Sequence, residues 1–447
     1  MKLKFLGAAQ TVTGSCFLLE EEETKILIDC GLYQGQDVVD KNYEEFNFDP
    51  SQIDYLIVTH AHLDHIGRIP KLIKEGFTGK ILSTAPTKQI APIVLNDSYD
   101  IMKREVSSEL LFEKEDIEQS LQRWETVDYN EKVELGDQIS FYFKEAGHIL
   151  GSAIVELRVS GKKIIFTGDL GNSPAPLLKG PSRIEEADYV IMESAYGGRT
   201  HEDKNRRKEL LEDVIEDTVS SGGTLMIPAF AIERTQELLY ELNSLVENKR
   251  IPKVPIFIDS PMAIEALSVY KNNKQYFDEE ASELMNQGDK LFKFPGLIFT
   301  ENEYQSKQIN DVQPPKVIVA GAGMSTGGRI LHHEIRYLPD PNSCLLLICY
   351  QVEGTLGREI MEGADKVEIF GKEIPVNAKV KEIGGYSNHA DQRQLLEWLG
   401  SLEEKPENVF ITQGEPESAE ALSQKINDKL GIATKVPSPD EEFELQV

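Results

Sequence analysis

The chain has few cysteines and histidines, and it has no long apolar run. Because no stretch of about 18 or more apolar residues occurs, we expect no transmembrane helix and no membrane partner. The four cysteines form no C-x-x-C pair and no framework typical of a small secreted protein, so we expect buried free thiols. The N-terminus lacks a signal peptide's apolar core, which predicts a cytoplasmic location.

Basic residues are also scarce, because 47 Lys and Arg face 76 Asp and Glu, giving a formal net charge of −29. An acidic surface repels nucleic acid at long range. Any nucleic-acid partner would therefore need a local basic groove or metal ions. The simplest role of the charge is solubility, or adaptation to a salty or crowded cytoplasm. The length of 447 residues suits two or three domains.

The apolar pattern predicts an α/β protein. Residues 2–33 predict two or three strands, and "DYLIVTH" (54–60) predicts a buried strand. "HIGRIPKLIKEG" (65–76) predicts a helix that ends at Gly76. After about residue 200, apolar strands alternate with helical or glycine-rich segments, which indicates a parallel sheet: "GTLMIPAF", "VPIFIDS", "KVIVAGAG" and "CLLLICY". Near residue 375 the chain returns to the first domain, so the middle block is an insertion.

Three of the eight histidines follow the buried strand, in "HAHLDH". His60 and His62 alternate along an extended segment, so both can bind one ion. After the chain turns, Asp64 and His65 face a second point a few ångströms away. Imidazoles with a carboxylate suit zinc at neutral pH. A surface helix has no need of four such residues in six positions, so the pattern predicts a metal site.

Two further strand ends supply candidate ligands. His148 lies in "EAGHILGSA" and Asp169 in "IIFTGDLG". Each alone is a weak signal, because a strand-end aspartate before glycine is usually a turn residue. Beside the histidine cluster both become metal ligands, and Asp169 is the natural bridge between two ions.

These motifs together resemble the metallo-β-lactamase fold, a four-layer αββα sandwich with metals at strand ends. "MESAYGG", "IPAFAIERTQELL", "DSPMA", "GAGMSTGGR" and "GGYSNHADQ" resemble its β-CASP branch. The resemblance runs from about residue 3 to residue 420. It implies residues 1–200 and 376–447 as the metallo-β-lactamase domain and 201–375 as an inserted β-CASP domain.

The resemblance implies a metal-dependent ribonuclease, with endo- or 5′-exonuclease action on RNA. Two Zn²⁺ ions per chain are expected, with Mn²⁺ as an alternative, and a homodimer stays open. In that mechanism metal-activated water hydrolyses the phosphodiester bond. The catalytic residues would be Asp64, Glu193 and His389: cationic His389 protonates the leaving oxygen or holds the phosphate, and Glu193 steers a ligand histidine. Asp29 would support the histidine loop without binding metal.

Substrate contacts are expected at the glycine-rich turn after a strand. Its backbone amides could hold a phosphate. The same pattern also fits close packing between a strand and a helix. The predicted RNA-binding residues are Ser325, Thr326, Gly327, Arg329 and His389. The histidines at 332 and 333 are expected to be bystanders, and "KNRRK" (204–208) is either a basic lip or a solvated helix start.

One position departs from the branch. Its third signature is a histidine of the second metal shell after a strand, where "VFITQGEPES" has Gln413. A glutamine oxygen is a poorer zinc ligand than imidazole. Three hypotheses follow: a weak but usable second site, binding through the amide oxygen or a water, or loss of the second metal.

Two rival functions remain. A small-molecule metallo-hydrolase of the same fold would fit the acidic charge, but the large insertion favours a polymer substrate. A non-catalytic RNA-binding protein would fit Gln413, but the intact "HAHLDH" set opposes it.

Overall fold

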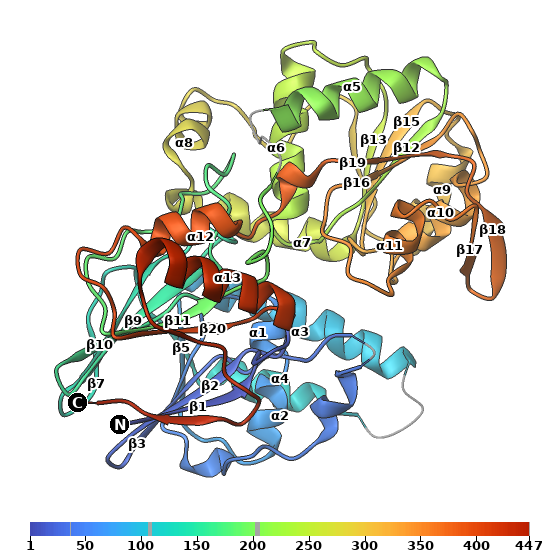
Figure 1. The fold of residues 1–447 in the computed structure, drawn as a ribbon. Coiled ribbons are helices and arrows are strands. Elements are labelled where there is room, and N and C mark those ends of the chain that lie inside the picture. Colours follow the sequence, from blue (N-terminus) through green and yellow to red (C-terminus); the bar gives the residue numbers. More distant parts are fainter. Residues whose placement is uncertain (36, 106–109, 202–205, 447) are drawn as a thin grey trace. The chain divides into compact units, whose positions relative to one another are not determined.

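The computed structural model describes residues 1–35, 37–105, 110–201 and 206–446. Its internal contacts divide the chain into two compact units (Figure 1). The first, here called the sandwich unit, comprises Met1–Thr200 and His389–Val447. The second, here called the inserted unit, comprises His201–Asn388. The chain thus leaves the sandwich unit once and returns to it, which is the order expected for an insertion.

Two seven-stranded sheets build the sandwich unit. The first has the order β22 (Glu442–Glu444), β1 (Lys2–Gly7), β2 (Cys16–Glu21), β3 (Thr24–Ile28), β4 (Tyr55–Ile57), β5 (Lys80–Ser83) and β6 (Trp124–Thr126). The second has the order β21 (Thr434–Lys435), β20 (Asn408–Thr412), β11 (Tyr189–Glu193), β10 (Lys162–Phe166), β9 (Ala153–Val159), β8 (Ile139–Glu145) and β7 (Val133–Gly136). Each sheet is mixed. In the first sheet β3 to β6 run parallel, while β1 to β3 form antiparallel hairpins. In the second sheet β10, β11 and β20 run parallel, while β8 to β10 are antiparallel.

The two sheets bury one apolar core between them. In β1 the apolar residues Leu3 and Phe5 are buried and alternate with lysines, the pattern of a strand with one covered face. Phe5 meets Phe410 of β20 across the interface, with ring centroids 5.2 Å apart. Phe17 of β2 and Phe166 of β10 form a second such pair at 5.9 Å. These aromatic pairs therefore stabilise the face-to-face packing of the two sheets.

Helices cover both outer faces of the sandwich (Figure 1). The apolar sides of α12 (Gln392–Leu399) and α13 (Pro416–Leu430) pack on the second sheet. On the other side lie α1 (Leu63–Ile66), α2 (Ile69–Lys74), α3 (Ala85–Glu105) and α4 (Lys114–Gln122). The predicted αββα order is confirmed.

The single helix expected over 65–76 is two short helices, α1 and α2. Pro70 lies in the first turn of α2, where its missing N–H needs no partner, so a new helix starts there. The Arg68 amide at the break donates to the Cys30 carbonyl oxygen instead, at 2.9 Å. This hydrogen bond connects the segment that carries the histidines to the loop after β3.

The inserted unit is built on a six-stranded sheet. Its order is β14 (Leu297–Phe299), β13 (Ile256–Asp259), β15 (Lys316–Ala320), β12 (Thr224–Pro228), β16 (Cys344–Leu347) and β19 (Lys379–Glu382), and every pairing is parallel. The α-helices of the unit are α5 (Arg207–Ser220), α6 (Arg234–Glu247), α7 (Pro261–Asn272), α8 (Glu279–Asn286), α9 (Glu303–Gln308), α10 (Ile330–Tyr337) and α11 (Leu356–Met361). A small hairpin joins β17 (Lys366–Ile369) to β18 (Lys372–Pro375).

The return to the sandwich unit lies later than the expected residue 376. Strand β19 hydrogen-bonds to β16, so it belongs to the inserted sheet. By its contacts the insertion therefore extends through Asn388. The segment carrying β19 resembles the flanking domain in sequence, but its strand pairing decides its place.

All four cysteines are free and buried, as expected: Cys16, Cys30, Cys344 and Cys349. Among the described residues, no helix combines the length and apolarity needed to cross a membrane.

Candidate metal centre

The predicted ligands of the sandwich unit gather at strand ends. His60 follows β4, and His62 is the residue before α1. His148 lies in the turn between β8 and β9, and Asp169 follows β10. Because the ends of β4 and β10 lie in facing sheets, segments far apart in sequence converge here.

Glycine allows two of these segments to approach closely. Gly168, directly before Asp169, has a φ of 53°. A Cβ atom there would stand 2.9 Å from Cβ of Thr59, which precedes His60. A larger residue would therefore push the Asp169 loop away from the His60 loop.

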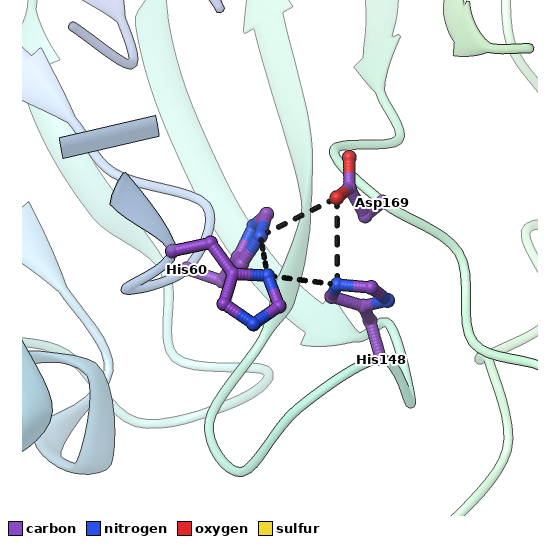
Figure 2. A group of neighbouring side chains, drawn as sticks. His60, His148 and Asp169 are labelled. Atoms are coloured by element: carbon purple, nitrogen blue, oxygen red, sulfur yellow. Dashed lines mark hydrogen bonds and ion pairs between the residues drawn. The ribbon is translucent and has the colours of Figure 1, made fainter. Parts of the chain in front are cut away.

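Four side chains form the first ligand group: His60, His62, His148 and Asp169, with ligand atoms all within 4.8 Å of one another. Figure 2 shows His60, His148 and Asp169 pointing toward a common point. Oδ2 of Asp169 lies 3.5 Å from Nε2 of His60 and 3.4 Å from Nε2 of His148. Nδ1 of His62 lies 3.1 Å and 3.0 Å from the same two imidazole nitrogens. Three ring nitrogens that face one another this closely fit ligands around one cation.

The protonation states of this group suit zinc. Burial lowers the pKa of His60 well below its ordinary value, which favours the neutral imidazole that binds metals. For Asp169, burial opposes ionisation, but the charge of His65 and its hydrogen bond hold the pKa of this carboxyl well below the usual range. Neutral imidazoles with an ionised carboxylate are a common zinc donor set, so the residues fit the ion.

Asp29 contacts Nδ1 of the His65 ring, as expected for an aspartate that supports the histidine loop. This nitrogen lies 2.7 Å from Oδ2 of Asp29. The same carboxylate accepts hydrogen bonds from the Ser15 hydroxyl at 3.0 Å and the Thr59 amide at 2.8 Å. Asp29 is 1% exposed, so these contacts fix it and direct Nε2 of His65 toward Asp169.

The predicted second-site residues surround that nitrogen. Nε2 of His65 lies 3.3 Å from Oδ1 of Asp169 and 3.8 Å from Oδ2 of Asp64. Burial lowers the pKa of His65, but the Asp169 and Asp29 carboxylates raise it well above its ordinary value. These carboxylates favour a positive charge at this point, which a proton or a metal ion can supply.

Gln413 lies in this second cluster, at the end of β20. Its Nε2 lies 2.6 Å from Oδ1 of Asp169 and 3.3 Å from Nε2 of His65. The side chain is buried, at 4% exposed. Sequence reasoning located the position, and the structure adds that the amide contacts the shared aspartate directly.

His389 and Glu193 form a pair with Asp169, because ligand atoms of the three lie within 4.8 Å of one another. Nδ1 of His389 lies 3.0 Å from Oε2 of Glu193, and the Leu170 amide donates to Oε1 of Glu193 at 2.5 Å. A backbone bridge between Gly171 and His389 holds the segment in place. Burial lowers the pKa of His389, but the Glu193 charge raises it more, to about 9. Glu193 therefore steers His389, rather than the metal-ligand histidine that we expected it to steer.

The predicted substrate residues Ser325, Thr326, Gly327 and Arg329 lie in the inserted unit, between β15 and α10. Ser325 is 1% exposed, and its hydroxyl donates to Oε1 of Glu334 at 2.5 Å. Thr326 is exposed. Arg329 donates from Nη1 to Asp259 at 2.7 Å.

Two minor expectations have structural outcomes. His333, expected to be a bystander, is buried and its Nε2 lies 2.7 Å from Oδ2 of Asp259. Helix periodicity gave no signal for this contact, because its partner is distant in sequence. In "KNRRK", residues 204 and 205 lie outside the described residues. Arg207 begins α5 and donates from Nε to Glu241 at 2.7 Å, so it is a buried helix residue.

Comparison with known families identifies all three segments. Residues 10–220 match the metallo-beta-lactamase superfamily and 235–360 match the Beta-Casp domain. Residues 373–437 match the Zn-dependent metallo-hydrolase RNA specificity domain. A ribonuclease of Thermus thermophilus is 40% identical over 426 residues, 95% of this chain and 96% of that protein. The chain belongs to the β-CASP family of metallo-β-lactamase-fold proteins. The predicted resemblance is confirmed.

Other β-CASP relatives span nearly all of this chain. An RNase J-like protein of Methanocaldococcus jannaschii is 34% identical over 439 residues, 97% of each chain. A transcription termination factor of Methanosarcina mazei is 31% identical over 452 residues, 97% of this chain and 70% of that protein. A crystal structure of a protein of unknown function from Enterococcus faecalis has the same fold, with a TM-score of 0.60, 13% identity and 99% of both chains covered.

Proposed function

We propose that this β-CASP protein is a metal-dependent ribonuclease that hydrolyses phosphodiester bonds in RNA. The convergence of four metal-ligand side chains beside the His389–Glu193 pair carries the proposal. The match to an RNA specificity domain over 373–437 and the relatives named ribonuclease and RNase J-like support the substrate.

Zn²⁺ is the proposed ion, with Mn²⁺ as the alternative. His60, His62, His148 and Asp169 would hold the first ion, and Asp64, His65 and Asp169 would hold a second. A bound divalent ion supplies Lewis-acid activation of water and offsets charge on the phosphate. The chain contributes fixed ligand directions, because Asp29 orients His65 and the loop glycine lets the ligand segments approach.

His389 is the proposed acid. Its Nδ1 lies 3.0 Å from Oε2 of Glu193, so the carboxylate fixes the direction of the ring beside Asp169. The raised pKa keeps the ring cationic near neutral pH, so it can donate a proton to the leaving oxygen or a hydrogen bond to the phosphate. Glu193 is then a positioning residue, because it acts on His389.

The glycine-rich turn is the proposed substrate contact in the inserted unit. Thr326 is exposed and Gly327 is partly exposed on this turn, and Arg329 adds a positive charge. Ser325 would contribute through its backbone, because its hydroxyl is engaged with Glu334.

A second function is favoured by one observation. The Gln413 amide, in its assigned orientation, donates a hydrogen bond to Asp169 in the second ligand cluster. If it excludes the second ion, the protein binds RNA and hydrolyses it slowly or not at all.

The test uses purified full-length protein, a labelled single-stranded RNA, and added Zn²⁺ or Mn²⁺. Asp169→Asn should lower cleavage by more than about 100-fold, because it removes the shared ligand. His332→Ala is the matched control, because it removes an exposed histidine of α10 in the inserted unit. Cleavage by wild type and control but not Asp169→Asn would support the ribonuclease. RNA binding without cleavage under all metal conditions would support the second function.

A further inference from the structure

One buried carboxylate organises the end of the inserted sheet. Asp259 is the last residue of β13, and it is 0% exposed. Its two oxygens accept hydrogen bonds from the Thr300 hydroxyl at 2.7 Å, the Ser306 hydroxyl at 2.6 Å and Nη1 of Arg329 at 2.7 Å. Nε2 of His333 also lies 2.7 Å from this carboxylate. These partners come from two segments of the chain, 300–306 and 329–333, so Asp259 joins the ends of β13 and β14 to α9 and α10.

This network keeps Asp259 ionised. Burial alone would raise its pKa, but the contacts from His333, Ser306 and the other donors lower it to about 2. A buried carboxylate with this many partners is costly to disturb and holds each partner in one place. Asp259 therefore fixes the direction of Arg329.

The guanidinium group of Arg329 is anchored through one of its nitrogens. Its Nη1 donates both to Asp259 and to the Thr300 carbonyl oxygen, the latter at 2.9 Å. Among the described residues, Nε and Nη2 have no hydrogen-bond partner, and the side chain is 21% exposed. One nitrogen is thus anchored while the rest of the guanidinium fork is left for a ligand. The fork suits a phosphate group, which guanidinium binds through two hydrogen bonds.

The position of Arg329 also favours a ligand contact. It follows β15 at the carboxyl edge of a parallel sheet, beside the ends of β13 and β14. Open parallel α/β sheets bind ligands outside the carboxyl ends of their strands.

We propose that Asp259 is a positioning residue for RNA binding, which holds Arg329 as a contact to a backbone phosphate. Thr300, Ser306 and His333 support Asp259 in this role. The inference rests on the proposed ribonuclease function, and it adds a residue group that acts on substrate affinity rather than on hydrolysis.

The proposal predicts a change in RNA affinity that is opposite to the change expected from the loss of a negative charge alone. Loss of the Asp259 charge leaves a more positive surface, which by itself strengthens RNA binding. If Asp259 positions Arg329, its loss instead weakens binding, because the guanidinium no longer points at the phosphate.

The experiment measures binding of the metal-loaded protein to a fluorescent, hydrolysis-resistant phosphorothioate oligoribonucleotide, between about 50 and about 200 mM salt. The variants are Arg329→Gln, Asp259→Asn and the double variant. Glu241→Gln is the matched control, because it also neutralises a buried, arginine-paired carboxylate of the inserted unit. Thermal unfolding of each variant is recorded beside its binding.

We expect Arg329→Gln to weaken binding several-fold and to reduce the slope of log K against log salt by about 0.7, the loss of one phosphate contact on a single strand. Asp259→Asn should give the same reduction, with no further reduction in the double variant and none in Glu241→Gln. An unchanged slope or tighter binding in Asp259→Asn would overturn the proposal.

If Asp259→Asn does not fold, His333→Asn replaces it, because that change removes one partner and keeps the carboxylate. A smaller slope and weaker binding would support the proposal, and wild-type binding would overturn it. A wild-type protein that neither binds nor cleaves RNA would remove the proposed function itself. Cleavage by wild type with unchanged slopes in both single variants would overturn only the role of Asp259.

Discussion

The side-chain amide of Gln413 lies 2.6 Å from Oδ1 of Asp169, the carboxylate that both ligand clusters share. A glutamine here can donate from nitrogen to the carboxylate or, with its amide reversed, present oxygen to a metal ion. The first arrangement competes with a second ion for Asp169, and the second arrangement supports it. The affinity of the second site therefore depends on this one side chain.

Gln413→His should strengthen the second metal site. An imidazole beside His65 and Asp169 is a better zinc ligand than an amide, so we expect the affinity for a second Zn²⁺ to rise at least about tenfold. The measurement is zinc titration by calorimetry, with the bound ions per chain counted by mass spectrometry.

Gln413→Leu is the control for this change, because it removes the amide without adding a ligand. It should not gain affinity for the second ion. Equal gains in both variants would mean that the amide merely blocked the site, and no gain in Gln413→His would contradict the assignment of the second cluster.

Asp29→Asn should weaken metal binding although Asp29 is not a ligand. The carboxylate fixes Nδ1 of His65 at 2.7 Å, and an amide cannot accept the same set of hydrogen bonds. We expect a loss of about 10- to 100-fold in metal affinity, the range for partners of metal-ligand histidines. Competition with a chromogenic chelator measures this affinity.

The matched control for this variant is Asp54→Asn. Asp54 is an exposed aspartate of the same unit whose carboxylate accepts the Lys25 amide. It should leave metal affinity unchanged. Similar losses in the two variants would indicate a general effect of charge rather than orientation of His65.

Glu193→Gln should separate metal binding from turnover. Glu193 contacts the Leu170 amide and His389, and a glutamine keeps its shape while removing the charge that holds the histidine. We expect the metal content and KM for RNA to stay near wild type while kcat falls by about 10- to 100-fold. A loss of metal with an unchanged kcat per bound ion would instead make Glu193 part of the metal site.

His60, His148 and Asp169 each follow an apolar strand, and strand ends are easily located from the sequence. That these strand ends converge depends on two facing sheets and on the antiparallel pairing of β8, β9 and β10, which the sequence does not show. The supporting role of Asp29 required the family resemblance, because a strand-end aspartate alone also fits a turn.

Long-range side-chain contacts could not be predicted. The contact between His333 and Asp259 joins residues 74 positions apart, and neither position has a local pattern that names the other. The contact-based end of the inserted unit, Asn388, lies beyond the predicted residue 375 for a related reason. Strand β19 is short and partly exposed, and only its pairing with β16 shows which sheet it joins.

The last prediction concerns the stability of the inserted unit. Glu334 of α10 is 0% exposed, and among the described residues its Oε2 has no hydrogen-bond partner. Burial raises the pKa of this carboxyl from 4.5 to about 7. Between these values the folded protein keeps a proton that the unfolded chain releases, so this group's contribution to stability falls as pH rises through the window.

Glu334→Gln removes this pH dependence, because an amide does not ionise. Relative to wild type, its free energy of unfolding should change little at pH 5 and gain on the order of 1–3 kcal/mol at pH 8. Denaturant unfolding at the two pH values measures the difference. Glu353→Gln, an exposed carboxylate of the same unit, is the control and should show no such gain. An offset for Glu334→Gln that is equal at both pH values would contradict the prediction, because an effect of ionisation must grow as pH rises from 5 to 8.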